Sequence, residues 1–390
     1  MKILAIETSC DETGIAILSS DSRKFGEPIN LLSNLVASQI ETHRRWGGVV
    51  PNLARREHQR NLIPLLTKSL QEALIIKPCR RWKLSLREKE IIHQVLSREP
   101  QLAKKLVKFL KRWNKPSIDL LAITTGPGLE PALWTGANLA LALSQIWQVP
   151  FVPVNHVEAH IIANWLAEPK PQDWPMMALV VSGGHTQLAF MKDPNSYQII
   201  GRTRDDAAGE CFDKTARVLD LGYPGGPIIS GLATQWREIN KSNAPEKIRK
   251  ISLPRPMINH PGYDFSFSGL KTAVLYQHRS YSDQLKRSPF YKLKMAAEIE
   301  DAINDVLIKK TINAASQYQA KTILIGGGVA ANKSLRRRLA TEAFSNNFKF
   351  FAPSVTLSTD NAAMIALTGL KYLKKASLSD TIKVNANLNL

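Results

Sequence analysis

Two segments of this chain repeat one strand–turn–strand pattern, and this repeat constrains the fold more than any other feature of the sequence. In the first copy, Lys2–Glu7 and Ile15–Leu18 are apolar strands on either side of a small polar turn. In the second copy, Met177–Val181 and Gln187–Met191 flank the turn Ser-Gly-Gly-His-Thr. Each copy opens a half of the chain in which strands and helices then alternate. This pattern predicts two duplicated α/β domains that face one cleft.

The 390 residues therefore divide into a first domain over 1–150 and a second domain over 151–360, with the C-terminal segment 361–390 returning to the first. A helix is expected to begin at Pro51, because proline suits the first turn, and to run to about Leu74. Further strands and helices alternate along both halves, at Asp119–Thr124, Ala132–Trp147, Thr322–Ile325 and about Ala331–Ala340.

The balance of charge is strongly basic, with a formal net charge of +19. Such a charge favours a polyanionic partner, and we expect nucleic acid rather than a membrane. No apolar run approaches the length of a membrane-spanning helix, and the start of the chain reaches Glu7 too early for a signal peptide. Cys10, Cys79 and Cys211 lie far apart and are expected to be free thiols. These features predict a cytoplasmic protein.

Over half of the net charge lies between Lys77 and Ser117, which carry a net +10 and interrupt the α/β order. Ser85 and Glu88 match a capping box, and a second apolar helix pattern follows Pro100. We expect an inserted basic helical hairpin with Trp82 and Trp113 near its ends. Its lysines are either a contact to a nucleic-acid backbone or part of a solvated hairpin that packs on the first domain or on a partner. The lysines concerned are Lys104, Lys105, Lys108 and Lys111.

His156 and His160 are four residues apart, so a helix would place both imidazoles on one face, where they can reach one divalent cation. The pattern is also compatible with a pair of surface or core histidines. A metal would need a further ligand, and Asp360 is one candidate, although a helix N-cap explains an aspartate at that position equally well.

Two glycine-rich turns follow apolar strands, at Ser182–Thr186 and at Gly326–Gly328. Bare backbone at such turns can approach a phosphate or an adenosine closely, although a triple-glycine turn can also be only a tight corner. Neither turn is a Walker loop or a dinucleotide fingerprint. The acidic stretch Asp205–Lys214 could accept hydrogen bonds from ribose or simply begin a helix.

Together these motifs resemble, in order along the chain, the tRNA adenosine threonylcarbamoyltransferase family, once described as O-sialoglycoprotein endopeptidases. The resemblance runs from Met1 to about Leu370 apart from the basic insert. The segments that carry it are Ile6–Thr13, Gly47–Pro51, Asn155–His160, Val181–Thr186, Asp206–Glu210, Phe212–Lys214, Tyr223–Pro227, Asp264–Thr272 and Gly327–Asn332.

The resemblance implies an actin/hexokinase/Hsp70-like fold and transfer of a threonylcarbamoyl group from threonylcarbamoyl-AMP to the adenosine next to the tRNA anticodon. It implies that His156, His160 and Asp360 ligate one divalent metal, iron or alternatively zinc. It further implies that the adenylate is bound by Val180, Val181, Ser182, Gly183, Gly184, Asp213, Gly226 and Asn332, with His185 bordering the site. Asp11 and Glu12 also border the site; either can help to remove the amine proton or can orient the loop.

The resemblance also implies partner proteins: a smaller paralogous subunit and a P-loop ATPase, as in bacterial complexes. Two other functions remain open. A metalloprotease would need a general-base glutamate, and Glu158 lies within the histidine pair, but it follows His156 by two residues and points to another side of the helix. A non-catalytic nucleotide-binding subunit is disfavoured by the presence of the histidine pair.

Overall fold

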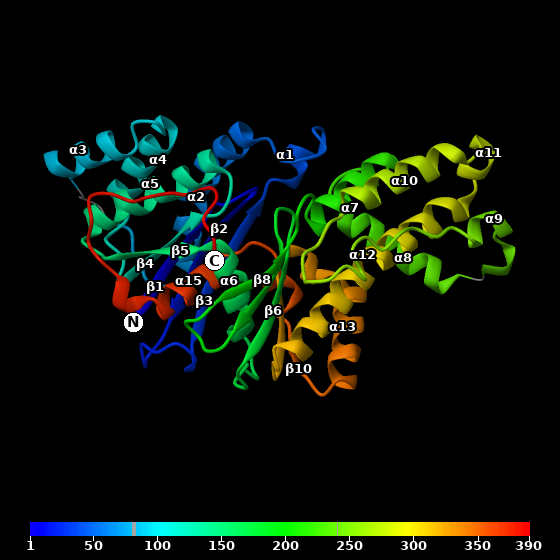
Figure 1. Ribbon diagram of the computed structural model, residues 1–390. Helices are drawn as coiled ribbons and strands as arrows, with labels where there is room; N and C mark the ends of the chain where they lie inside the picture. Colours follow the sequence, from blue (N-terminus) through cyan, green and yellow to red (C-terminus); the bar gives the residue numbers. More distant parts are fainter. Residues whose placement is uncertain (80–82, 240) are drawn as a thin grey trace. The chain divides into compact units, whose positions relative to one another are not determined.

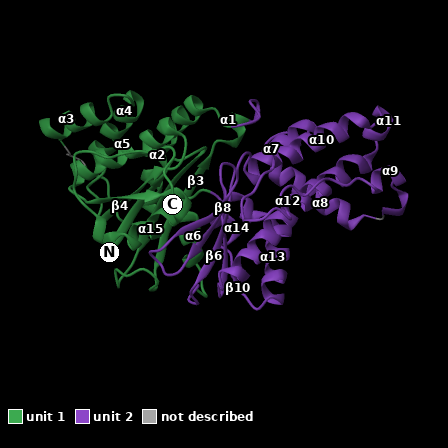
Figure 2. Ribbon diagram, in the orientation of Figure 1, with its two compact units in different colours: residues 1–43, 49–170, 360–390 green, residues 44–48, 171–359 purple. Residues whose placement is uncertain are grey.

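The computed structural model describes residues 1–79, 83–239 and 241–390, so Trp82 lies outside the described residues. The chain forms two compact units (Figure 2). Unit 1 comprises Met1–His43, Val49–Lys170 and Asp360–Leu390, and unit 2 comprises Arg44–Gly48 and Pro171–Thr359. Among the described helices, none is both long and apolar enough to cross a membrane. Cys10, Cys79 and Cys211 are free thiols.

Unit 1 is built on a sheet with the strand order β3-β2-β1-β4-β5 among its described residues (Figure 1). β1 pairs antiparallel with β2 and parallel with β4, and β4 pairs parallel with β5. The carboxyl ends of β1, β4 and β5 therefore meet at one edge of the sheet. The strands are β1 (Lys2–Glu7), β2 (Glu12–Ser19), β3 (Asn30–Ser38), β4 (Leu120–Gly126) and β5 (Phe151–Asn155).

Helices cover both faces of this sheet. Leu121 and Ile123 of β4 belong to the core shared with α2 and α5, whereas Ala122 between them packs against Gly369 of α15. Since successive strand residues face opposite sides, α15 lies on the face opposite α2 and α5. The helices of unit 1 are α1 (Ile40–Arg44, whose last residue falls in unit 2), α2 (Pro51–Glu72), α3 (Leu86–Val95), α4 (Pro100–Arg112), α5 (Glu130–Trp147), α6 (His156–Ile162) and α15 (Ala362–Lys371).

Unit 2 repeats the same topology, with the order β8-β7-β6-β9-β10 and the same pattern of antiparallel and parallel pairs. The duplicated α/β architecture expected from the two hairpins is thus confirmed. The strands are β6 (Met176–Val181), β7 (Thr186–Met191), β8 (Gln198–Arg202), β9 (Thr322–Gly326) and β10 (Lys349–Phe351). The helices are α7 (Ala208–Val218), α8 (Gly225–Glu238), α9 (Glu246–Arg249), α10 (Ser268–Ser280), α11 (Asp283–Lys286), α12 (Pro289–Gln317), α13 (Lys333–Ser345) and α14 (Val355–Ser358).

The division between the units falls after Lys170, not at residue 150 as the sequence suggested. The reason is that β5 pairs with β4 and leads directly into α6, so residues 151–170 pack with unit 1. Both histidines of the candidate metal pair consequently belong to unit 1.

The basic insert forms two helices that pack on unit 1. The capping box is confirmed: the Ser85 hydroxyl accepts from the Glu88 amide at 3.1 Å, and the Glu88 carboxylate accepts from the Ser85 amide at 2.7 Å. The apolar side of α4 is buried in the core of unit 1, through Leu102, Leu106, Phe109 and Leu110. Lys104, Lys108 and Lys111 form an exposed stripe on the other side of α4.

Lys105 has a structural contact that the sequence analysis did not anticipate. Pro64 lies inside α2 and has no amide hydrogen, so the carbonyl of Arg60, four residues earlier, loses its helical partner. The Lys105 ammonium donates to this carbonyl at 2.8 Å and to that of Gln59 at 3.3 Å. Lys105 therefore connects α4 to α2 at the carbonyl group whose helical hydrogen bond is missing because of Pro64.

We expect Lys105→Ala to lower the free energy of unfolding by about 1–2 kcal/mol, the usual cost of losing a hydrogen bond from a charged donor. The exposed Lys104→Ala should change it by less than about 0.5 kcal/mol. In a Pro64→Ala background, where the backbone supplies the missing donor, the effect of Lys105→Ala should shrink. Urea denaturation of Lys105→Ala, Lys104→Ala, Pro64→Ala and the Pro64→Ala/Lys105→Ala double variant measures these differences. An equally large effect of Lys105→Ala with and without Pro64 would contradict the account.

Candidate functional site

The two histidines lie one turn apart on α6, directly after β5. Asn155 is the N-cap of this helix, and its side-chain oxygen accepts from the amides of Val157 and Glu158 at 2.9 and 3.1 Å. His156 and His160 are buried, and their Nε2 atoms are 3.2 Å apart. The structure thus confirms the helical placement that the spacing predicted.

Asp360 faces this pair from the start of α15. Its Oδ1 is 3.0 Å from His160 Nε2 and 3.5 Å from His156 Nε2. The N-cap of α15 is the next residue, Asn361, whose side chain accepts from the amides of Ala363 and Met364 at 3.1 and 3.2 Å. The N-cap role considered for Asp360 is therefore wrong, because its neighbour caps the helix. Its own carboxylate faces the imidazoles, and its role as a metal ligand stays a prediction.

These three side chains fit a divalent metal ion. Two imidazole nitrogens and one carboxylate oxygen are a common ligand set for iron and zinc. Ligand atoms about 2.1 Å from one ion lie about 3.0–3.4 Å from each other in octahedral or tetrahedral geometry. The three separations here, 3.0, 3.2 and 3.5 Å, match that range closely.

Glu7 orients the imidazole of His156 by contacting Nδ1, the ring nitrogen opposite the candidate ligand atom. The sequence analysis did not assign this role. Its Oε2 lies 3.1 Å from His156 Nδ1 and accepts from the Thr124 hydroxyl at 2.6 Å. A carboxylate on Nδ1 fixes the tautomer that leaves Nε2 available to a metal. One feature of the sequence could have identified Glu7: it is an acidic residue at the end of an otherwise apolar, buried strand.

Glu7 and His156 shift each other's pKa through this close contact. Burial alone would raise the pKa of Glu7, but the charge and hydrogen bond of His156 outweigh it, and the pKa lies below its usual value. Burial likewise acts to lower the pKa of His156, whereas Asp360 and Glu7 raise it to about 9.

Asp11 lies in the loop between β1 and β2, and Glu12 is the first residue of β2, at the same edge of the sheet. Burial and the neighbouring carboxylates of Asp11 and Asp360 raise the pKa of Glu12 well above its usual value. A carboxyl group with a raised pKa is suited to proton exchange. The structure places the pair beside the candidate metal site, and their catalytic role stays a prediction.

His58 of α2 holds this loop in place. Its Nε2 donates to the Cys10 carbonyl at 3.0 Å, and its Nδ1 accepts from the Thr13 hydroxyl at 2.8 Å. Burial lowers the pKa of His58 to about 4, so the imidazole is neutral and serves as one donor and one acceptor. The residues on either side of Asp11 and Glu12 are therefore fixed by one side chain from a distant helix, which the sequence analysis missed.

The residues expected to bind an adenylate all belong to unit 2. Val180–His185 lie at the end of β6 and Asn332 follows β9, whereas Asp213 and Gly226 lie in α7 and α8. Val180 and Val181 are fully buried, and their predicted contact with the adenylate stays a prediction. The Ser182 hydroxyl accepts from the His185 amide at 3.0 Å, which closes the turn. A Cβ built on Gly183 or Gly184 would meet no atom within 4 Å, so open space borders this backbone.

The turn after β9 packs directly on the end of β6. Gly327 has a φ of +93°, and a Cβ there would lie 2.3 Å from the Val181 carbonyl oxygen. Only glycine allows this approach of two backbones. The second glycine-rich motif is therefore a close backbone contact next to the open turn at Gly183 and Gly184.

Asp213 and Asn332 each have partners within unit 2. Asp213 of α7 accepts from the amide of Gly225, the first residue of α8 and the neighbour of Gly226, at 2.7 Å. Asn332 caps α13 by accepting from the Leu335 amide at 2.8 Å, and it donates to Glu300 at 2.7 Å. The observed contacts of Asn332 thus support local structure, and its predicted contact with the adenylate stays a prediction.

Comparison with known proteins identifies the family. The model of the tRNA N6-adenosine threonylcarbamoyltransferase family matches residues 30–78 and 100–367. The chain belongs to this family. Between its two matched segments the family model leaves out residues 79–99, which include α3, and this gap is shorter than the expected insert at 77–117.

Two curated members of the threonylcarbamoyltransferase family align over nearly their whole length. The protein from Persephonella marina is 39% identical over 96% of this chain and 91% of its own, and the protein from Bacillus cereus is 39% identical over 100% and 96%. Both are named tRNA N6-adenosine threonylcarbamoyltransferase.

Among solved structures, full-length HypF in its phosphate- and nucleotide-bound form is similar with a TM-score of 0.50 at 10% identity, over 96% of this chain and 46% of that one. At this identity the likeness concerns the fold alone. Together with the two equivalent strand orders, it confirms the actin/hexokinase/Hsp70-like fold.

Glu158 is not positioned to act as the general base of a metalloprotease. Its carboxylate accepts from Lys371 Nζ at 2.5 Å and from the Tyr372 hydroxyl at 2.7 Å, both at the end of α15. Glu158 is therefore engaged in a buried ion pair. This contact argues against the metalloprotease alternative, which would need that carboxylate at a metal-bound water.

We predict that His156→Ala, His160→Ala and Asp360→Ala each lower the metal content of the purified protein, because each removes one of three ligands. Elemental analysis after equilibration with ferrous iron measures the metal content. Normal occupancy in one of these variants would remove that residue from the ligand set.

We further predict that Glu7→Gln lowers the affinity for the metal by about 10- to 100-fold, the usual effect of losing a group that orients a ligand. Glu158→Gln, the same change on a buried carboxylate of the same unit that faces Lys371, is the matched control and should leave metal affinity unchanged. Competition with a chelator measures both affinities, and equal effects would show that Glu7 has no specific role.

Proposed function

We propose that this chain transfers the threonylcarbamoyl group from threonylcarbamoyl-AMP to the exocyclic amine of the adenosine next to the tRNA anticodon, with release of AMP. The observation that carries the proposal is the convergence of His156 Nε2 and His160 Nε2 on one oxygen of Asp360, in a chain 39% identical to curated tRNA N6-adenosine threonylcarbamoyltransferases.

In the proposed reaction, the adenosine amine attacks the threonylcarbamoyl carbonyl, the bond from that carbon to the AMP oxygen breaks, and the amine loses one proton. Threonylcarbamoyl-AMP is an activated mixed anhydride, so correct positioning and a polarised carbonyl are the main requirements. A divalent ion held by His156, His160 and Asp360, which we propose to be iron, would supply Lewis-acid polarisation. Zinc is the alternative.

The residues around the ligands have separate tasks in this proposal. Glu7 keeps the His156 ring oriented through Nδ1. Glu12, whose pKa is raised, is the side chain that we propose to accept the amine proton, and Asp11 beside it supports that raised pKa. His58 keeps this loop in position through the Cys10 carbonyl and the Thr13 hydroxyl.

The AMP portion of the donor is proposed to bind at the carboxyl ends of β6 and β9. The open backbone at Gly183 and Gly184 supports this, since phosphate oxygens can approach amide groups there without side-chain interference. Val180, Val181, Ser182, His185, Asp213, Gly226 and Asn332 complete the proposed site.

We also propose a cellular compartment and partner proteins for this chain. We expect the chain to act in the cytoplasm, where tRNA is available, and to work with a smaller paralogous subunit and a P-loop ATPase, as the family resemblance implies. These partners are testable by co-purification.

The direct test is incubation of the metal-loaded protein, with the expected partner proteins, with threonylcarbamoyl-AMP and an unmodified tRNA. We expect threonylcarbamoyladenosine in the tRNA and AMP in solution, both measured by mass spectrometry. A glycoprotein substrate should remain uncleaved. Cleavage of the glycoprotein without modification of the tRNA would instead support the protease alternative.

The open turn provides a specific test of the adenylate site. Gly183→Ala combined with Gly184→Ala adds two methyl groups in space that the protein does not fill. We expect AMP affinity to fall by about tenfold or more, because a methyl group forced against a ligand costs about 1–3 kcal/mol, while the thermal midpoint stays the same.

The matched control is Gly231→Ala in α8, where an added Cβ also meets no atom within 4 Å. Calorimetry should show unchanged AMP affinity in this control. Equal AMP affinity in the double variant and the wild type would place the nucleotide away from this turn.

A further inference from the structure

A groove of about 400 Å³ lies between α2 and α4 in unit 1. Both helices are labelled in Figure 1 and pack against each other. The groove is lined by Lys68 from α2 and by Lys105, Lys108 and Arg112 from α4, with Pro64 and Phe109 among its apolar lining residues. It is separate from the metal ligands and from the glycine-rich turns.

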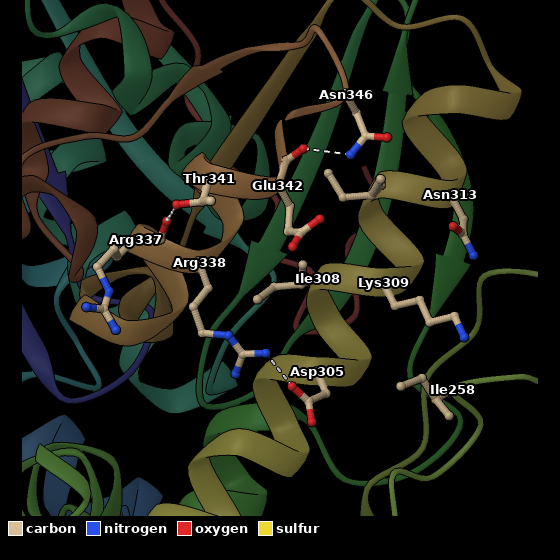
Figure 3. A pocket seen from close by; sticks show the side chains of 11 residues that line it. Ile258, Asp305, Ile308, Lys309, Asn313, Arg337, Arg338, Thr341, Glu342 and Asn346 are labelled. Carbon is tan, nitrogen blue, oxygen red and sulfur yellow. Dashed lines mark hydrogen bonds and ion pairs between the residues drawn. The ribbon is translucent and has the colours of Figure 1, made fainter. Parts of the chain in front are cut away.

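The charge of this groove is entirely positive, since its lining includes four cationic side chains and no carboxylate. A larger groove in unit 2, about 760 Å³ between α12 and α13, provides a contrast (Figure 3). There Arg338 is paired with Asp305, and Glu342 also lines the groove. Lys309 and Arg337 line that groove as well, so its lining carries a net charge of +1, against +4 in the α2–α4 groove. The larger positive charge of the α2–α4 groove attracts a polyanion more strongly.

Three of the four cations are available to an anion. Lys105 is engaged with the carbonyl groups of α2. Within the part of the chain that the structure describes, Lys108 and Arg112 have no carboxylate partner, and Lys68 has only the exposed Glu72 at 3.9 Å. The exposed stripe of Lys104 and Lys111 continues the positive surface along α4.

The apolar floor of the groove offers little surface to a protein partner. Phe109 and Trp113 are only 4% and 7% exposed, because both belong to the core of unit 1. A partner helix would need a substantial apolar surface at the centre of its contact. The groove therefore suits a ligand that binds through charge.

The groove also lies at a suitable distance from the candidate active site. His58 of α2 contacts Cys10 and Thr13, which flank Asp11 and Glu12, and Lys68 follows it ten residues later on the same helix. At 1.5 Å per residue, this separation is about 15 Å along the helix axis. That is the length of a few stacked base pairs, so a nucleic acid with its target base at the site can extend to the groove.

We propose that the α2–α4 groove binds the phosphate backbone of the tRNA stem next to the anticodon loop, through Lys68, Lys108 and Arg112. The inference rests on the proposed function, which supplies the tRNA, and assigns its contact to a specific surface. Lys105 contributes by holding α4 against α2, and not by contacting phosphate.

The test compares a groove variant with a matched control. The groove variant is Lys68→Gln, Lys108→Gln and Arg112→Gln. The control is Lys192→Gln, Lys374→Gln and Arg249→Gln, the same change in charge at exposed positions on other elements. The probe is an unmodified tRNA transcript with adenosine next to its anticodon, and binding is measured by fluorescence anisotropy over a series of salt concentrations.

We expect the groove variant to bind the tRNA about 10- to 100-fold more weakly at 0.1 M salt, and the slope of log affinity against log salt to fall by about 2–3 units. The control should shift both quantities less. Metal content and AMP affinity should equal those of the wild type in both variants, because neither change touches those sites.

Two outcomes would overturn the proposal, and they differ from each other. If the wild type binds and modifies tRNA but the groove variant shows unaltered affinity and slope, the groove does not contact the tRNA. If the wild type neither binds nor modifies tRNA, with its expected partners present, the proposed function fails and the groove assignment fails with it.

Discussion

The contacts of the buried Glu7 carboxylate are the interactions on which the rest of unit 1 depends. It ends β1, accepts from Thr124 of β4 and contacts His156 at the junction of β5 and α6. Three parallel strands thus meet at one carboxylate at their common edge. Because that contact fixes the Nδ1 side of His156, Nε2 faces His160 and Asp360, and the three potential ligand atoms converge.

The duplication shows why metal chemistry is expected in one unit and not in the other. β1 and β6 have the same length and the same place in equivalent sheets, but β1 ends in Glu7 and β6 ends in Val181. In unit 1 the strand end orients an imidazole. In unit 2 the corresponding strand end leaves only backbone, against which Gly327 packs and beside which Gly183 and Gly184 remain open. The two equivalent sheets thus present different groups at the same edge: side chains that can hold a metal in unit 1, and open glycine backbone in unit 2.

Much of this arrangement could be predicted from the sequence, because local patterns determine it. The alternation of strands and helices predicted the duplicated fold, and the spacing of His156 and His160 predicted their shared helix face. The contacts of Glu7, His58 and Lys105 could not be predicted, since each joins elements that are distant in the sequence. The domain boundary differs for the same reason: the pairing of β5 with β4 and the packing of α6 against α15 place residues 151–170 in unit 1.

The central claim is that the site around His156, His160 and Asp360 makes the chain a tRNA threonylcarbamoyltransferase. Nucleoside mass spectrometry of tRNA from cells depleted of this protein tests it most directly. The account predicts that threonylcarbamoyladenosine disappears on depletion and returns with the wild-type gene, but not with a gene that carries His156→Ala. An unchanged level of threonylcarbamoyladenosine in the depleted cells, or full recovery with the variant, would contradict it.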